Sequence, residues 1–196
     1  MADLNKFVLS LQNRGFHAAA FETCEEANAY LVSKLAGKSI GLGGCKTLRD
    51  MGLDNALLAA GATLLGHHYG ATQAQAAAAP VYISSVNGAA ETGELINIDG
   101  TGNRVAATLY GHKKVYFIVG RNKLAPTYDE ALWRARNIAA PRNAQRLQRK
   151  TPCAINGDRC YDCKSPDRIC RGLVVHWGAM MGMKMEVVLV DEDLGL

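Results

Sequence analysis

The sequence lacks any apolar run long enough to cross a lipid bilayer, because such a helix needs about 20 consecutive apolar residues. Its first residues, MADLNKFVLSLQNRGF, carry charge within their apolar part and show no secretory cleavage pattern. Internal repeats and low-complexity linkers are also missing. We therefore expect a cytoplasmic protein without a membrane span, in which thiols stay reduced.

Aromatic residues are scarce, at 7% of the chain, and the net charge is a mild +4. The local excess of positive charge lies near the C-terminal part, at Arg134, Arg136, Arg142, Arg146 and Arg149. These arginines recur at helical spacing without interleaved aromatic side chains, which is typical of a solvated helix face. The sequence therefore predicts no nucleic-acid partner.

Two nucleotide-binding patterns are absent from the glycine-rich segment GLGGCKT, residues 41–47. The segment matches neither GxxxxGK[ST] nor GxGxxG, so the chain has no Walker A loop and no NAD motif there. Its glycines let several backbone N–H groups gather beside the positive start of a helix. A phosphate or carboxylate site and a plain tight turn fit this spacing equally well. The candidate ligand-binding residues are Gly41, Gly43, Gly44, Lys46 and Thr47.

Strands alternate with helices along most of the chain. Strand-like runs cover residues 16–21, 38–42, 62–65, 81–86, 95–98 and 115–119. Helical patterns lie between them. This alternation predicts an α/β fold with a mainly parallel sheet flanked by helices. A ligand site is then expected beyond the carboxyl ends of the strands, where the glycine turns fall.

The alternation changes toward the C-terminus. We predict two helices, over residues 128–140 and 142–149, separated by Pro141. Beyond the cysteine-rich stretch, residues 173–176 and 185–190 look like a closing pair of strands.

Four of the six cysteines fall within TPCAINGDRCYDCKSPDRIC, with the spacing C-x6-C-x2-C-x6-C. They are Cys153, Cys160, Cys163 and Cys170. Turn-forming residues surround them, so the segment buries little apolar surface and needs another source of stability. Four thiolates on flexible turns can close around a zinc ion or an iron–sulfur cluster. The CxxC step is characteristic of chelation, but the longer gaps match no standard finger or ferredoxin run, and free thiols or oxidation-sensitive pairs are the alternative.

A second polar region, NGAAETGELINIDGTGNR, carries two glycine turns that flank a strand. Polar groups at both ends of a buried strand could meet over the sheet edge and bind a small ligand. Glu91 could serve as a base or carboxylate nucleophile, and Arg104 could orient an acid group through two hydrogen bonds. Ordinary turn chemistry, with capping by Asp99 and Asn103, is the competing interpretation.

Four segments together resemble the lactate-utilisation domain family (LUD domain), in its short, stand-alone form. They are GLGGCKTLRDMGL, SSVNGAAETGELINIDGTGNRVAA, VYFIVGRNKL and RNIAAPRNAQRL. DRCYDCKSPDRIC also resembles the cysteine-bearing stretch of the short members. The sequence departs from the family pattern at Cys45, where serine is common, and at His112, where proline is common.

The resemblance implies a fold similar to the NagB/RpiA/CoA-transferase superfamily. One domain would cover residues 1–196, with an N-terminal helical region over residues 1–36 and the cysteine-rich loop over residues 151–171. In that superfamily a turn like residues 41–47 contacts phosphate or a CoA-like group. A glutamate at the position of Glu91 acts as nucleophile or base in some relatives.

The resemblance also implies a part in the oxidation of L-lactate or a related hydroxy acid, within a redox system that includes partner proteins. Glu91 and Asp99 are then the candidate catalytic residues, and Asn103, Arg104 and Lys123 join the glycine turn in binding a small anionic metabolite. Two hypotheses of other classes stay open. One is a non-redox enzyme or binder of a CoA ester, sugar phosphate or folate-like molecule; the other is a metal-stabilised interaction subunit without turnover. A homo-oligomer is compatible with each.

Overall fold

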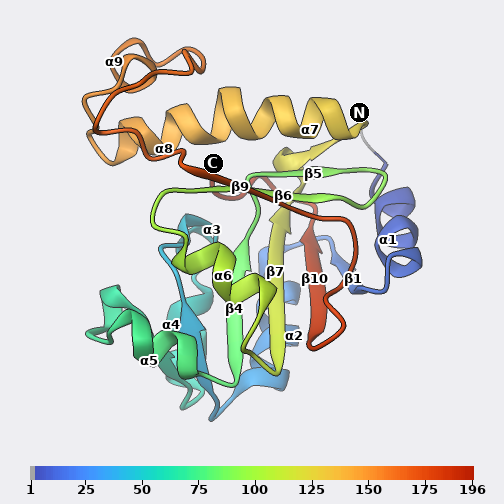
Figure 1. Cartoon of the computed structure of the whole chain (residues 1–196). Coiled ribbons are helices and arrows are strands. Elements are labelled where there is room, and N and C mark those ends of the chain that lie inside the picture. The colour runs from blue at the N-terminus through green and yellow to red at the C-terminus, as the bar shows by residue number, and fades with distance from the viewer. Residues whose placement is uncertain (1–2) are drawn as a thin grey trace.

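The structure, a computed structural model, describes residues 3–196 and is built on a six-stranded parallel sheet (Figure 1). The strand order is β1-β10-β7-β4-β2-β3, and each neighbouring pair is parallel. The strands are β1 (His17–Phe21), β2 (Ser39–Leu42), β3 (Thr63–Leu65), β4 (Val81–Ser85), β7 (Lys114–Gly120) and β10 (Lys184–Val190). The predicted α/β fold with a mainly parallel sheet is confirmed.

A second, smaller sheet lies across the carboxyl end of the first (Figure 1). Its order is β8-β5-β6-β9, where β6 is antiparallel to both of its neighbours. Its strands are β5 (Gly88–Ala90), β6 (Leu95–Asp99), β8 (Leu124–Ala125) and β9 (Gly172–His176).

Both strands of the predicted closing pair are present, but they do not pair with each other. β9 pairs with β6 in the small sheet, while β10 enters the large sheet between β1 and β7. The two strands differ in burial: β10 is buried along all but its first residue, as a central parallel strand must be, whereas most of β9 is at least partly exposed. Their closeness in sequence therefore did not make them partners.

Helices cover both faces of the large sheet. They are α1 (Leu4–Asn13), α2 (Cys24–Leu35), α3 (Lys46–Asp50), α4 (Leu53–Ala59), α5 (Gln73–Ala78) and α6 (Asn103–Leu109). Three further helices, α7 (Tyr128–Arg134), α8 (Ala140–Arg146) and α9 (Pro152–Asn156), lie on the side of the small sheet that faces away from the large sheet (Figure 1). Short 3-10 turns, η1 (His67–Tyr69) and η2 (Arg121–Lys123), follow β3 and β7. No helix within residues 3–196 combines the length and apolar character that crossing a membrane requires.

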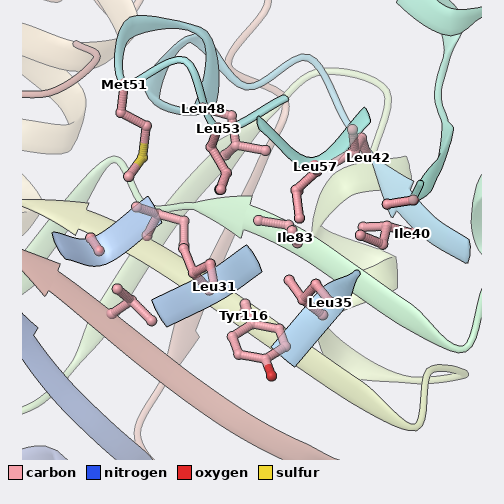
Figure 2. Close-up of a cluster of buried hydrophobic side chains, with 14 of the residues drawn as sticks. Leu31, Leu35, Ile40, Leu42, Leu48, Met51, Leu53, Leu57, Ile83 and Tyr116 are labelled. Atoms are coloured by element: carbon pink, nitrogen blue, oxygen red, sulfur yellow. The ribbon is translucent and has the colours of Figure 1, made fainter. Parts of the chain in front are cut away.

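Two apolar clusters hold the helices to the sheet, one on each face. Successive residues of a strand point to opposite faces, so Tyr116 and Ile118 of β7 join one cluster while Val115 and Phe117 join the other. Figure 2 shows the first cluster, in which α2 and α4 pack against β2 and β4 through Leu31, Leu35, Ile40, Leu53, Leu57 and Ile83. α1 and α6 contribute to the second cluster.

One continuous helical stretch runs from Tyr128 to Arg146 above the small sheet (Figure 1). The predicted break at Pro141 is wrong. A π turn, η3 (Ala135–Ala139), joins α7 to α8 and shifts the hydrogen-bond register just before the proline. The missing N–H of Pro141 therefore does not end the helix. α7 lies so close to β5 that a Cβ at Gly88 would sit 2.4 Å from the carbonyl oxygen of Ala131.

Candidate functional site

Loops that follow β2, β4, β6 and β7 meet over the carboxyl edge of the large sheet and enclose a cavity. Its volume is about 80 Å³. The glycine turn forms one wall, and the end of β4, the small sheet and α8 supply the others. The lining side chains include Lys46, Thr47, Ser85, Asn87, Arg104, Lys123 and Arg146. Ligand sites of open parallel sheets fall at this edge.

Lys123 is buried at the base of this cavity, with 2% of its surface exposed. The turn η2 follows β7 and brings the side chain beneath the glycine turn. Its Nζ donates to Thr47 Oγ1 and to Ser85 Oγ, both at 2.7 Å. Both partners are neutral hydroxyls, and an ammonium has three N–H donors. The two hydroxyls therefore use two of the three N–H donors of Lys123, and the third can donate to another group.

Burial lowers the pKa of Lys123 to about 8, because the ammonium loses its hydration. Cys45 acts in the opposite direction, and Arg134 and Arg104 lower the pKa further. At neutral pH the amine is still mostly charged, but it can release its proton just above neutrality. Lys123 can thus bind an anion or, once deprotonated, accept a proton.

Arg104, in the first turn of α6, ties the small sheet to the end of β4. Its Nε pairs with Asp99 Oδ2 at 3.1 Å. Its other nitrogens donate to the carbonyl oxygens of Ile98 at 2.8 Å and Ser85 at 3.3 Å, and to the buried amide oxygen of Asn97. The guanidinium therefore lines the cavity while most of its donors serve the protein itself.

Asp99 supports this arrangement from the turn after β6. Its Oδ1 accepts from the backbone N–H groups of Thr101 at 3.1 Å and Gly102 at 2.8 Å. These bonds match the competing interpretation of the sequence, in which Asp99 caps a turn. Asp99 thus orders the turn and orients Arg104.

The cavity opens into a wider cleft of about 300 Å³. Asp99 and Asn103 lie on one wall, and Arg146 and Arg149 lie on the other. Both arginines are exposed, as the sequence predicted, and α8 with the turn that follows it places them along this cleft. The cleft is therefore rich in positive charge.

Two glycines of the segment 41–47 lie so close to neighbouring residues that a larger side chain would collide with them. A Cβ at Gly41 would lie 2.3 Å from the carbonyl oxygen of Ala76, and one at Gly43 would lie 2.9 Å from Tyr82 Oη. Lys46 Nζ pairs with Asp50 on α3, at 2.5 Å. Gly44, Lys46 and Thr47 line the cavity, whereas Gly41 lies within β2.

Glu91 lines neither the cavity nor the cleft. It follows β5, at the end of the small sheet that faces α1 (Figure 1), where it accepts from Lys6 Nζ at 2.8 Å and from the backbone N–H of Asp3. β6 runs between this turn and Asp99, and an extended strand separates its ends by about 3.3 Å per residue. The structure therefore does not bring Glu91 together with the glycine turn, and its catalytic role stays a prediction.

We expect Glu91→Gln to lower the melting temperature by roughly a few degrees at pH 7 and to leave anion binding in the cleft unchanged. The Asp3 N–H and Lys6 hold the pKa of Glu91 below its ordinary value of 4.5. The stabilisation is thus present above pH 4.5 and is lost as the pH falls through the depressed pKa. Differential scanning calorimetry at pH 7 and in acid measures both effects. Lost ligand affinity with an unchanged melting temperature would instead support a catalytic Glu91.

Ser85 is a site residue that sequence reasoning missed. Its hydroxyl donates to the carbonyl oxygen of Ile118 at 2.6 Å and accepts from Lys123. The available signal was a pair of serines ending the otherwise apolar strand β4. Polar residues at the carboxyl end of a buried parallel strand point to a site at that edge.

The four clustered cysteines surround a second, small cavity beside α8. Cys153 belongs to α9, and Cys160, Cys163 and Cys170 belong to the irregular loop of residues 157–171. None of the six cysteines is in a disulfide. Within residues 3–196, no group of three or more Cys, His, Asp or Glu side chains is arranged to hold a single metal ion. The cysteines are thus brought together, and the metal centre stays a prediction.

Comparisons with known proteins agree with this architecture. The chain is similar to the crystal structure of a DUF162 family protein from Deinococcus radiodurans, with a TM-score of 0.56 and 15% identity over 95% of each chain, which is a likeness of fold. A weaker likeness to eIF2B beta from Chaetomium thermophilum has a TM-score of 0.40 and 13% identity, and it covers 55% of this chain and 44% of that one. A search of curated proteins found no match. The LUD domain family model matches residues 4–190, so the chain belongs to the LUD domain family and is of the lactate-utilisation type.

Proposed function

We propose that the cavity around Lys123 binds a small hydroxy or keto acid and that the chain takes part in oxidising L-lactate or a related hydroxy acid. In that oxidation the acid loses two electrons and two protons, and a redox protein of the same system accepts the electrons. The chain's own contribution is to bind and orient the acid.

The observation that carries the proposal is the buried ammonium of Lys123. Within residues 3–196, no carboxylate forms a salt bridge with it. A buried charge is costly unless an opposite charge accompanies it. The carboxylate of a bound acid would supply that charge, and the third N–H of Lys123 would donate to it.

The size of the cavity supports a small acid. A cavity of about 80 Å³ holds several water-sized groups. A three-carbon acid matches this volume, whereas the body of a CoA ester does not. The hydroxyls of Thr47 and Ser85 would fix the orientation of such an acid, and Arg104 would face its charged end.

A second function is favoured by the outer cleft. Arg146 and Arg149 line about 300 Å³ of open space, which suits a phosphate-bearing ligand larger than lactate. Under this alternative the chain would bind a sugar phosphate or the phosphates of a CoA ester, with no oxidation.

Titration calorimetry with L-lactate, pyruvate and inorganic phosphate distinguishes these functions. We expect both acids to bind, and Arg146→Gln to weaken binding about tenfold, or about 1.4 kcal/mol. Arg142→Gln is the matched control, because Arg142 is an exposed arginine of α8 that does not line the cleft.

Binding of phosphate alone would favour the second function, and binding of none of the three anions would contradict both. The redox part needs its own assay, which is lactate-dependent dye reduction by the chain together with candidate redox partners. No reduction in any combination would count against oxidation.

A further inference from the structure

We propose that Cys153, Cys160, Cys163 and Cys170 hold an iron–sulfur cluster in the cavity that they line. The inference is independent of the proposed function, because it depends only on this loop. All four cysteines face one cavity although residues 157–171 contain no regular helix or strand. Four thiolates are the ligand set that iron–sulfur clusters take in proteins.

A hydrogen bond to its first sulfur orders the CxxC turn. The backbone N–H of Asp162 donates to Cys160 Sγ at 3.3 Å, and Asp162 has a left-handed φ of 45°. The chain therefore folds back over the first sulfur and brings Cys163 to the same side. The hydroxyl of the buried Thr151 lies 3.3 Å from Cys153 Sγ. Hydrogen bonds of this kind stabilise the negative charge of thiolate ligands.

Arg168 fixes the spacing of the other two cysteines. Its Nη1 donates to the carbonyl oxygen of Cys163 and its Nε to that of Cys170, both at 2.8 Å. Both Arg168 and Arg136 line the cavity. Two guanidinium groups beside four thiolates offset the negative charge that a bound cluster would carry.

The arrangement of the four sulfurs favours a cluster over a single zinc ion. Zinc binds its sulfur ligands at about 2.3 Å from one centre, and within residues 3–196 no three of these side chains are arranged to hold one ion. A cluster instead spreads its four cysteines over several iron atoms. The cavity of about 10 Å³ holds one water-sized sphere, so the loop must open outward to take up the cluster. Ala140, Pro141, Ala144 and Ile169 complete an apolar lining that would exclude water.

The loop is held in place by the candidate site. The backbone N–H of Arg171 donates to the carbonyl oxygen of Asp99 at 2.9 Å. A Cβ at Gly100 would lie 2.8 Å from the carbonyl oxygen of Ile169, so the turn and the loop are in close contact. Ile169 itself lines both the cleft and the cysteine cavity. The proposed centre is therefore adjacent to the anion site.

The test is anaerobic purification and reconstitution with iron and sulfide, followed by metal analysis and visible spectroscopy. We expect a brown protein that contains iron and acid-labile sulfide in equal amounts. Cys163→Ser and Cys153→Ser should each lose most of the iron. Cys45→Ser alters a cysteine that does not line the cysteine cavity, so this variant should keep the iron content of the wild type.

Two results on the wild-type chain would overturn the inference without any variant. One is a colourless protein with stoichiometric zinc and no iron after reconstitution. The other is a metal-free protein whose four cysteines titrate as free thiols or are recovered as disulfides. Full iron retention in both Cys153→Ser and Cys163→Ser would also contradict it. Circular dichroism establishes that each variant is folded before its iron content is compared.

Discussion

Lys123→Met should increase the free energy of unfolding at pH 7 and abolish the binding of small acids in the cavity that it lines. The drop in pKa from 10.5 to about 8 corresponds to about 3 kcal/mol, which is the cost of keeping the ammonium charged in its buried position. Methionine has a similar length and carries no charge. Thr47 Oγ1 and Ser85 Oγ lie 3.2 Å apart and can still bond to each other, so the gain is up to about 3 kcal/mol.

The stability that Lys123→Met gains over the wild type should decrease as the pH rises. Between pH 8 and 10.5 the unfolded chain keeps the proton on Lys123 while the native protein has lost it. The wild type therefore becomes more stable relative to the variant as the pH rises through this window. Anion affinity of the wild type should fall over the same rise, because the neutral amine no longer attracts the ligand.

Urea unfolding of both proteins at pH 7 and pH 10, together with calorimetric titration of L-lactate, checks these expectations. Lys113→Met is the control, since Lys113 is exposed and lies outside the cavity. The control should change neither stability nor affinity appreciably. A Lys123→Met variant that unfolds more easily than the wild type, or that binds lactate normally, would contradict the role given to this residue.

Arg104→Met should lower the free energy of unfolding by about 2–3 kcal/mol, because a partly buried ion pair and several hydrogen bonds to a charged group are lost together. Asp99 would lose the guanidinium at 3.1 Å, and the carbonyl oxygen of Ile98 and the side-chain oxygen of Asn97 would lose their donors. Asn97 is fully buried, so water cannot easily replace the bond that its side-chain oxygen loses. The free energy of unfolding of Arg104→Lys should lie between that of the wild type and that of Arg104→Met, because one ammonium cannot reach all of these acceptors.

Arg121→Met provides a matched comparison for this loss. Arg121 also pairs with carboxylates, with Asp193 at 3.1 Å and Asp191 at 3.6 Å, but all three side chains are largely exposed. Exposed pairs contribute about 1 kcal/mol or less. In chemical unfolding, Arg104→Met should therefore lose clearly more free energy of unfolding than Arg121→Met. Equal losses would show that Arg104 does not join the sheets in the way described.

The sequence was sufficient to predict the features that depend on local pattern. Continuous apolar runs such as residues 115–119 predicted buried parallel strands, and the glycine turn after residues 38–42 was placed at the carboxyl edge of the sheet. The four cysteines, which lie close together in sequence, also line one small cavity, and the metal centre itself stays a prediction. In each case a short segment contained the information.

Features that depend on partners far away in the sequence could not be predicted in this way. Polar residues at both ends of β6 were expected to meet, but a straight strand keeps its ends apart, so Glu91 pairs with α1 instead. Arg146 reached the cleft only because a π turn carries the helix through Pro141. Lys123 was suggested by resemblance alone, since no local pattern reveals that a lysine will be buried beneath another loop.

The place of β10 in the large sheet has a consequence for how this chain is made. β10 fills the gap between β1 and β7, so His17–Phe21 pairs with nothing in the large sheet until residues 186–190 have left the ribosome. Until then both neighbouring strands have an open edge that other chains could join. Such distant pairing is slow to form, and we expect nascent chains of this protein to need protection from aggregation until β10 has emerged.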